Sequence, residues 1–454
     1  MKKSYDFLKV PFLIVLVLLP FEGFEILSFA DIHLSLPFFL IVITAFVSVL
    51  RIILKGRFSA DLSTLLAILI LIFGFTSVFS GFIEGSSKLE LFKSFFLILI
   101  LVLYFIGISQ VRFTLGGIVL ILKLLVLSGV VWSLVGIYQA LANNTSLPDL
   151  FFNLTNPITG TQRISYFGSY IRPTSIFTEP SWFGHYLILS LASLVGVYKK
   201  MNKASFYFCL LSLISGIIST LSFGSYLLLI ILLFFTANLL LLRKRRRKLL
   251  TKPKKNNRNL LKGIYFLFGI VIIIFLIKIT LYPLQMIYQE IELRMNIVFS
   301  ALKHYFLSPE PFVVYDSVSM RLSLSYAGIM IWLNSPLTLF FGVGLGNFFY
   351  GAKKFLGVSF GYSGTGWTNI LAEQGLLGFM SYFLFFISYI FKFRKLIKQD
   401  ESKVDTYYIS RSLYLLTVML FFSAFTGGFG FERSITIWSM FVVLEVAYNA
   451  LKVF

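Results

Sequence analysis

The sequence contains many apolar runs about as long as the roughly 20 helical residues that cross a bilayer core. Only 13% of the residues are charged and 58% are hydrophobic, whereas about a quarter of the residues in a soluble domain are charged. The pattern therefore predicts an all-α integral membrane protein with about twelve transmembrane helices. The predicted spans are residues 8–27, 36–54, 62–80, 91–109, 115–141, 181–198, 204–222, 224–242, 261–281, 370–391, 409–426 and 434–451.

Two regions interrupt this pattern. In the first span, Pro20, Glu22, Gly23 and Glu25 predict a kink or an early helix end. In residues 204–242, only the LSFGSY stretch separates two short apolar runs. This region is therefore either two helices or one broken helix.

Basic residues predict the orientation of the spans, because loops that stay in the cytoplasm carry an excess of lysine and arginine. With a cytoplasmic N-terminus, more than half of the 40 basic residues fall in inner segments, including the basic cytoplasmic loop 243–262. Both termini are then cytoplasmic. The outer face receives two long loops, residues 142–180 and 282–369, within a single polytopic domain 1–454. Apolar parts of these loops predict short interfacial helices.

Composition also excludes several functions. The net charge of +21 would suit a protein that binds nucleic acid, but basic cytoplasmic loops already account for it, so no nucleic-acid partner is expected. Cys209 is the single cysteine and cannot form an internal disulfide. With three histidines and one cysteine, a zinc site with several such ligands is not expected. We predict no metal and no other cofactor.

Some basic residues depart from the positive-inside pattern because they lie in the predicted outer loops. They are Arg163, Arg172, Arg294, Lys303, Arg321, Lys353 and Lys354. Such residues either bind an anionic ligand at the outer face or pair with nearby acidic residues or lipid head groups. The surroundings of Arg172 and Arg321 favour an anionic ligand.

The first motif, RPTSIFTEPSWFGHY, covers residues 172–186. A Thr-Glu pair precedes Pro180, which is typical of a helix start. The free N–H groups of such a helix end favour an anion, and the planar guanidinium of Arg172 suits a phosphate. Glu179 is either a helix cap or an acid, base or sugar ligand. His185 is interpreted as a packing residue.

The second motif covers residues 317–379. Its GVGLG sequence, residues 342–346, has the spacing of a dinucleotide-binding loop, but no βαβ pattern accompanies it. The glycines instead predict a tight turn or a close backbone approach. Trp-Thr-Asn at residues 367–369 predicts the cap of the next transmembrane helix. Glu373 follows one turn later, where a carboxylate suits the helix dipole.

Together these motifs resemble the O-antigen polymerase and ligase superfamily (Wzy and the related ligases), which are membrane glycosyltransferases of the GT-C type. The matches are Arg172 followed by FTEP; Arg321 followed by Trp332, Ser335-Pro336-Leu337 and FGVGLGNF; and Asn369 followed by ILAEQGLLGF. They span residues 172–379, and the twelve-helix topology with its large outer loop extends the resemblance to the whole chain. The resemblance implies a GT-C-like fold.

One departure from the family pattern separates two activities. The ligases usually carry His-Asn where this chain has Thr368-Asn369, and that histidine is implicated in their activity. The sequence therefore favours a polymerase over a ligase. It also leaves the identity of the general base open.

The resemblance implies transfer of a growing glycan from polyprenyl (undecaprenyl) pyrophosphate to a sugar hydroxyl on an incoming lipid-linked repeat unit. This is O-antigen polymerisation, a step of lipopolysaccharide biosynthesis. The leaving group is a highly charged pyrophosphate, so arginines and helix N-termini should stabilise it most strongly. We expect Arg172 and Arg321 to be catalytic without a metal, with Arg294 as a weaker third candidate.

The acceptor hydroxyl must lose a proton, and the outer-face groups that can take it are Glu179, Glu373 and His304, of which Glu179 ranks first. Aromatic residues of the outer loops either stack on sugars or anchor the chain at the interface. The expected substrate-binding residues are Arg294, His304, Asn369, Glu373, Tyr170 and Trp367.

The implied partners are the undecaprenyl-pyrophosphate-linked oligosaccharide as donor and acceptor, membrane lipid and a polysaccharide chain-length regulator. The implied location is the bacterial inner membrane, with the active site facing the periplasm. The alternatives are an O-antigen ligase, a flippase or transporter of lipid-linked oligosaccharide, and a scaffold without enzymatic activity. Transporters often contain internal repeats. This sequence shows no convincing repeat, and its polar motifs concentrate outside the spans, which favours an enzyme.

Overall fold

The structure is a computed structural model that describes most of the chain. The described residues are 6–23, 25–29, 32–55, 60–145, 147–148, 150, 165–167, 170–177, 179–250, 317–357, 364–399, 404–426 and 434–453. They belong to two compact units, residues 1–232 with 327–454, and residues 233–326. Two helices, α9 (Phe223–Leu250) and α12 (Ser317–Leu333), contain the unit boundaries.

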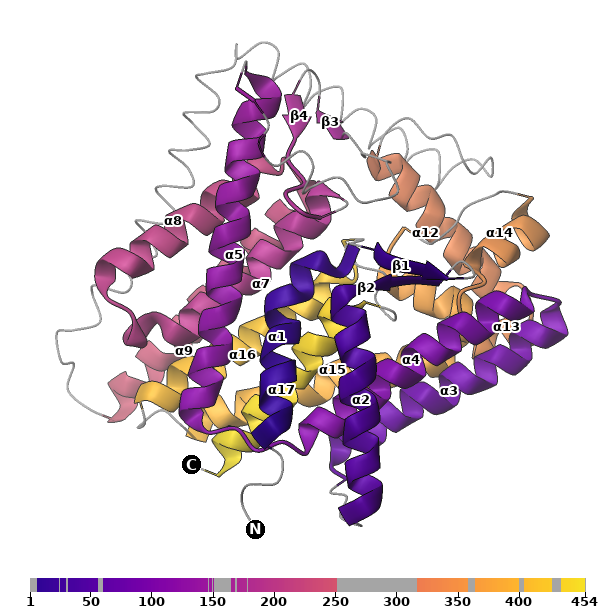
Figure 1. The fold of residues 1–454 in the computed structure, drawn as a ribbon, viewed down its shortest axis with the longest axis horizontal. Helices are drawn as coiled ribbons and strands as arrows, with labels where there is room; N and C mark the ends of the chain where they lie inside the picture. The colour runs from indigo at the N-terminus through magenta and orange to yellow at the C-terminus, as the bar shows by residue number, and fades with distance from the viewer. Residues whose placement is uncertain are drawn as a thin grey trace. The chain divides into compact units, whose positions relative to one another are not determined.

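Helices make up nearly all of the described first unit (Figure 1). They are α1 (Lys9–Leu18), α2 (Leu36–Lys55), α3 (Leu62–Glu84), α4 (Lys88–Ser109), α5 (Leu115–Asn144), α7 (Pro180–Val197), α8 (Lys203–Ser219), α13 (Pro336–Phe341), α14 (Phe348–Leu356), α15 (Gly366–Gln399), α16 (Val404–Ser423) and α17 (Ile435–Lys452). Two antiparallel ribbons contain the described strands. They are β1 (Glu25–Phe29) with β2 (Ile32–Ser35), and β3 (Ser165–Phe167) with β4 (Tyr170–Arg172).

Eight of the described helices are long and apolar enough to cross a membrane, namely α2, α3, α4, α5, α7, α9, α15 and α17. This confirms a mainly helical, multi-pass membrane protein. Two more predicted spans coincide largely with α8 and α16. The predicted span 261–281 lies outside the described residues. The total of twelve spans and their orientation stay predictions.

The helix bounds decide the alternative that the sequence left open and correct one predicted span. Residues 204–242 form two helices, because α8 ends at Ser219 and α9 begins at Phe223. Leu221, between them, has a positive φ of 45°, a conformation that does not continue a helix. The predicted span 370–391 was too short at both ends, since α15 runs from Gly366 to Gln399 with a break at Gly375.

The first predicted span, 8–27, ends early, as its proline and acidic residues indicate. Helix α1 stops at Leu18, and a 3₁₀ segment, Leu19–Gly23, follows before β1. The carboxylate of Glu22 accepts hydrogen bonds from the backbone N–H groups of Ile435 (2.6 Å) and Thr436 (3.0 Å). These N–H groups have no partner within α17 itself, because they lie in its first turn. The chain leaves the α1 helix where Glu22 can cap α17.

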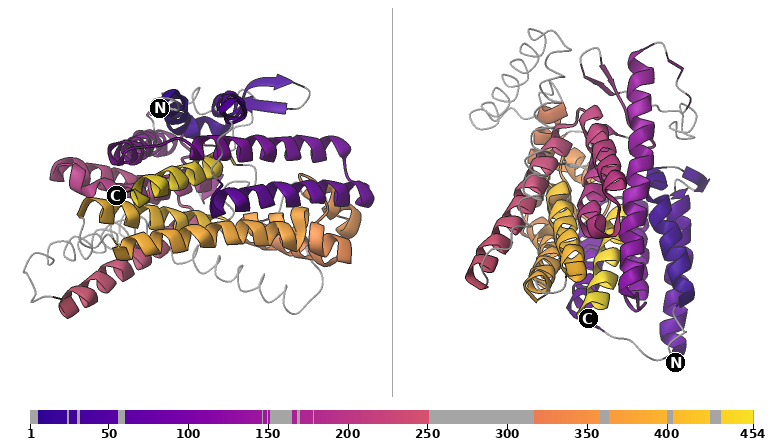
Figure 2. Two further views of the ribbon diagram at one scale, coloured as in Figure 1. Left: turned by 90° about the horizontal axis from the view of Figure 1, so that it is seen from below. Right: turned by 90° about the vertical axis from the view of Figure 1, so that its left-hand side faces the viewer.

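Helices α7 and α17 form the centre of the first unit. In each, 83% of the residues in the apolar window are buried, compared with 33% in α2. Helix α7 packs against α5, α8 and α16, and α17 packs against α4 and α5. On the other side of the unit, α3 lies alongside α4 and α15 (Figure 2).

Glycines let these helices approach closely, and serines on the neighbouring helix occupy the space. A Cβ added to Gly129 of α5 would lie 2.3 Å from the Oγ of Ser190 on α7. The same contact joins four other helix pairs: Gly107 with Ser48, Gly184 with Ser225, Gly196 with Ser412, and Gly216 with Ser133. Small residues are typical of membrane helix interfaces, because lipid provides no hydrophobic force that drives helices together.

We therefore predict that Gly129→Ala destabilises the protein, whereas Gly116→Ala in the same helix does not. An added Cβ at Gly116 meets nothing closer than 3.9 Å, so this change gains helix propensity of up to about 1 kcal/mol. Overpacking at Gly129 should cost about 1–3 kcal/mol. Thermal unfolding of the two purified variants in detergent measures the difference, and equal melting temperatures would contradict the close α5–α7 contact.

Candidate functional site

Arg172 lies at the end of β4, and helix α5 holds this strand in place. The side-chain amide of Asn144, at the C-terminus of α5, donates to the carbonyl of Ile171 (2.9 Å) and accepts from its N–H (2.9 Å). The Arg172 side chain is half-buried, and its Nε donates to the carbonyl of Thr220, just after α8, at 2.8 Å. The first candidate arginine therefore bridges β4 and the α8–α9 turn.

A second side-chain amide of α5, that of Gln139, binds the irregular segment between Arg172 and α7. The Oε1 atom of Gln139 accepts from the N–H groups of Thr174 (2.9 Å) and Ser175 (2.8 Å). Ser175 has a positive φ of 52°, and its hydroxyl donates to the carbonyl of Trp132 at 3.0 Å. These bonds satisfy backbone groups that would otherwise be costly to bury.

The predicted helix start is confirmed. Helix α7 begins at Pro180, with Glu179 as the N-cap residue. The Glu179 side chain makes no capping hydrogen bond to the backbone; instead, Ser181 Oγ donates to its Oε2 at 3.2 Å. Glu179 is half-buried, so its carboxylate lies at the helix end where negative charge is favoured.

His185, one turn further along α7, is 1% exposed. Its Nε2 lies 3.1 Å from the hydroxyl of Thr426, which follows the C-terminus of α16. A buried, hydrogen-bonded imidazole agrees with the interpretation of His185 as a packing residue.

The start of α15 lies against the same end of α16. The N–H of Gly366 donates to the carbonyl of Ala424 at 2.9 Å. The sequence placed the cap at residues 367–369, but the helix begins earlier: Thr365 Oγ1 accepts from the N–H of Thr368 at 3.3 Å. Asn369 is therefore inside the first turn and is 6% exposed.

The C-terminal end of α16 thus joins two motifs that are far apart in the sequence. Ala424 contacts the start of α15, and Thr426 contacts His185 of α7. Both α7 and α15 pack against α16 over their lengths. The structure therefore brings residues 172–186 and 366–369 to the same end of the first unit.

Trp367 packs in an aromatic cluster and is only 3% exposed. Its ring lies 5.1–6.4 Å, between centroids, from five phenylalanines on α15 and on α16 with the residues after it: Phe379, Phe383, Phe386, Phe421 and Phe425. A sugar-stacking surface needs an open ring face. The structure gives Trp367 a packing role instead of the expected stacking surface.

The glycines of the GVGLG loop allow a close backbone approach, as predicted. Gly342, Gly344 and Gly346 all have positive φ, from 73° to 98°. A Cβ at Gly342 would lie 2.2 Å from the backbone of Glu373, and one at Gly346 would lie 2.1 Å from Ser94 Oγ. The N–H groups of Val343 and Gly344 donate to carbonyls of α15 at 2.9 and 3.0 Å.

The Glu373 carboxylate binds the C-terminal end of this loop. It is buried, 1% exposed, and accepts from the N–H groups of Gly346 (2.8 Å) and Phe348 (3.3 Å). Phe348 is the first residue of α14, so the carboxylate lies at a helix N-terminus, where its charge is favourable. Ser77 of α3 donates to the Glu373 carbonyl at 2.7 Å. Glu373 therefore joins α3, α14 and α15.

The remaining candidates are placed only in part. Arg321 lies on α12 in the second unit and is half-buried. The backbone of Tyr170 pairs with Phe167 in the β3–β4 ribbon, and its side chain is not described. Arg294 and His304 lie outside the described residues. No group of three or more histidine, cysteine, aspartate or glutamate residues that could hold a metal is present in the described part.

Sequence reasoning missed the residues that position the first motif: Gln139, Asn144, Thr220 and Thr426. Gln139 and Asn144 are polar residues at the end of the long apolar run that forms α5. That position was an available signal, because polar groups at a span end often bind irregular backbone. Thr220 and Thr426 contribute through local geometry, for which the sequence contains no signal.

Comparison with known proteins identifies no family. No protein-family model matches the chain, and a search of curated proteins finds no significant match. The family resemblance of the motifs therefore enters the function only as a proposal.

The hydrogen bonds of Glu373 predict that this residue stabilises the fold, which can be tested apart from any role in catalysis. Glu373→Gln and Glu373→Ala should both lower stability, because each leaves a buried loop N–H without its acceptor, at about 1–3 kcal/mol per group. Glu90→Gln is the matched control, since the Glu90 side chain is 47% exposed and pairs with Lys93 at 3.4 Å. Thermal unfolding of the purified variants in detergent gives the order of their melting temperatures. A Glu373→Gln variant that keeps full stability while losing activity would contradict the structural role.

Proposed function

We propose that this chain is a membrane glycosyltransferase of the O-antigen polymerase type. The reaction is transfer of a growing glycan from undecaprenyl pyrophosphate to a sugar hydroxyl on an incoming lipid-linked repeat unit. The site faces the periplasm from the bacterial inner membrane. One observation carries the proposal: helix α7, which follows Arg172 and FTEP, and the start of α15, which contains Asn369, meet at the C-terminal end of α16.

In this proposal the chemistry depends on charge stabilisation. The bond between the glycan and the pyrophosphate breaks as the acceptor oxygen attacks, and negative charge develops on the leaving pyrophosphate. Arginine forms charge-assisted, paired hydrogen bonds with phosphate oxygens. We assign Arg172 and Arg321 to the pyrophosphate, with Arg294 as a weaker contributor and no metal. The N-terminus of α7 adds a favourable dipole beside Arg172.

Glu179 is our candidate for the general base that takes the proton of the acceptor hydroxyl. It lies at the start of α7 and is half-buried, so a substrate at this helix end is within its reach. Glu373 is a weaker candidate, because its oxygens are buried and already bind the GVGLG loop and α14. His304 and Asn369 remain proposed substrate contacts, and Tyr170 a proposed sugar-stacking residue.

The test measures the length of the surface glycan on cells that depend on this chain. Arg172→Ala and Arg321→Ala should leave single repeat units on the surface lipid, because removing one charge-stabilising donor slows chemistry by about 100-fold or more. The matched control is Lys353→Ala, which removes an exposed cation of α14 in the same predicted outer loop as Arg321. This control should keep long chains.

Membrane abundance and thermal stability of each variant must accompany the assay, because Arg172 also binds the Thr220 carbonyl. Arg172→Lys keeps the cation without the planar fork, and it should give chains of intermediate length if the charge is catalytic. Long chains on stable arginine variants would overturn the assignment. Loss of the single repeat unit as well would indicate export or ligation, which are the activities of the alternative flippase and ligase.

A further inference from the structure

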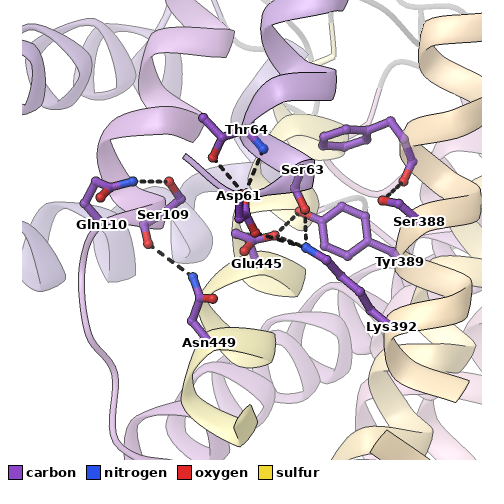
Figure 3. A network of polar contacts seen from close by, with 11 residues as sticks. Asp61, Ser63, Thr64, Ser109, Gln110, Ser388, Tyr389, Lys392, Glu445 and Asn449 are labelled. Atoms are coloured by element: carbon purple, nitrogen blue, oxygen red, sulfur yellow. Dashed lines mark hydrogen bonds and ion pairs between the residues drawn. The ribbon is translucent and has the colours of Figure 1, made fainter. Parts of the chain in front are cut away.

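A group of ionisable side chains lies between three helices, away from the motifs of the proposed function (Figure 3). Asp61 immediately precedes α3, Tyr389 and Lys392 lie on the C-terminal half of α15, and Glu445 lies on α17. The predicted span 370–391 ended just before Lys392, but α15 continues through it and the Lys392 side chain is only 12% exposed.

Lys392 contacts both carboxyl groups. Its Nζ lies 3.2 Å from Asp61 Oδ2 and 3.2 Å from Glu445 Oε2, and it also binds the hydroxyl of Ser63. The ammonium lies 4.5 Å from the centre of the Tyr448 ring, a cation–π contact. The hydroxyl of Tyr389 donates to Glu445 Oε2 at 2.7 Å.

The charges in this group do not balance if every member is ionised. Two carboxylates and one ammonium leave a net charge of −1 beside Glu445, whose side chain is 1% exposed. Asp61 is 37% exposed and can stay charged, but a second carboxylate buried at Glu445 is expensive, and the group takes up a proton instead. Asp61 and Glu445 each approach Lys392 Nζ to 3.2 Å, so their carboxyl groups are neighbours. Two neighbouring carboxyl groups can hydrogen-bond to each other only when one of them carries a proton.

The surroundings of Asp61 favour its ionised form. Its Oδ1 accepts from the N–H and the hydroxyl of Thr64, each at 2.9 Å, and it caps the N-terminus of α3. Burial opposes ionisation, but the hydrogen bond with Glu445, the charge of Lys392 and the bonds to Thr64 together lower the pKa of Asp61 to about 2.

The surroundings of Glu445 favour its protonated form. Its Oε1 is buried and, within the described part of the chain, receives no hydrogen bond from an N–H or O–H group. Glu445 interacts with Lys392, Asp61 and Tyr389. A proton on Oε1, donated to the Asp61 carboxylate, satisfies both this oxygen and the charge balance.

We propose that Asp61, Lys392 and Glu445 form a proton-binding site between α3, α15 and α17. Glu445 holds the proton at neutral pH, and Asp61 is the anion that pairs with Lys392. Loss of the proton would leave two carboxylates facing each other and would push α17 away from the start of α3. This site does not depend on the proposed glycosyltransferase activity.

Two isosteric amide variants distinguish the two carboxyl groups. Glu445→Gln replaces a neutral acid with a neutral amide, so the melting temperature of the detergent-purified protein should stay close to that of the wild type. Asp61→Asn removes the anion that pairs with Lys392, so the buried Glu445 must release its proton to replace it, and the melting temperature should fall by several degrees. A fall in Glu445→Gln equal to or larger than that in Asp61→Asn would overturn the proposal.

A spectroscopic measurement keeps the test valid if Asp61→Asn fails to accumulate. Infrared spectra of wild-type protein, with glutamate carboxyl groups labelled by ¹³C, should show the C=O stretch of a protonated glutamic acid at neutral pH. This band should be absent from Glu445→Gln. An identical band in both proteins, or no band in the wild type, would show that Glu445 does not hold the proton.

Discussion

The first unit depends on close contact between helices at small residues. Where Gly129, Gly184, Gly196 and Gly216 face serines of neighbouring helices, the backbones approach too closely for any added side chain. In lipid, contacts of this kind replace the hydrophobic force that assembles soluble proteins. They concentrate on α7, which contributes Gly184, Ser190 and Gly196. Helix α7 begins at the candidate site, so the same packing that builds the bundle fixes the position of Pro180 and its capping residue.

Close helix packing leaves the irregular backbone as the remaining problem, because unpaired N–H groups are costly away from water. In the described structure, single polar side chains accept hydrogen bonds from such N–H groups at several places. Gln139 binds the segment before α7, Glu373 binds the GVGLG loop, and Glu22 binds the first turn of α17. Two of them, Gln139 and Glu373, bind the backbone of the sequence motifs. A polar residue near the motifs can therefore have a structural role, binding backbone N–H groups, instead of a catalytic one. Glu373 is the clearest case.

Local patterns in the sequence predicted what local physics controls. The Thr-Glu-Pro sequence predicted the start of α7, and the spacing of Gly342, Gly344 and Gly346 predicted a close backbone approach. Contacts between distant segments escaped prediction. Glu22 caps α17 across more than 400 residues of sequence, and the N–H of Gly366 binds the carbonyl of Ala424 after α16. Lys392, which follows the predicted span 370–391, lies inside α15 and contacts two carboxyl groups from other segments. Partners such as these depend on the fold, which no window of sequence contains.

Helix α15 carries two polar regions, one on each side of its break at Gly375. The candidate site includes the start of α15, at Gly366, and the proposed proton site lies at Lys392. Because the helix is broken at Gly375, the regular rise of 1.5 Å per residue applies from there on, and it places Lys392 about 26 Å along that segment. The proposed proton site therefore lies towards the C-terminal end of the segment. Transporters bind their substrates and coupling ions near the bilayer midplane. A proton site in this position is better explained by stabilising the bundle than by coupling to transport, and the proposed glycosyl transfer belongs to the start of α15.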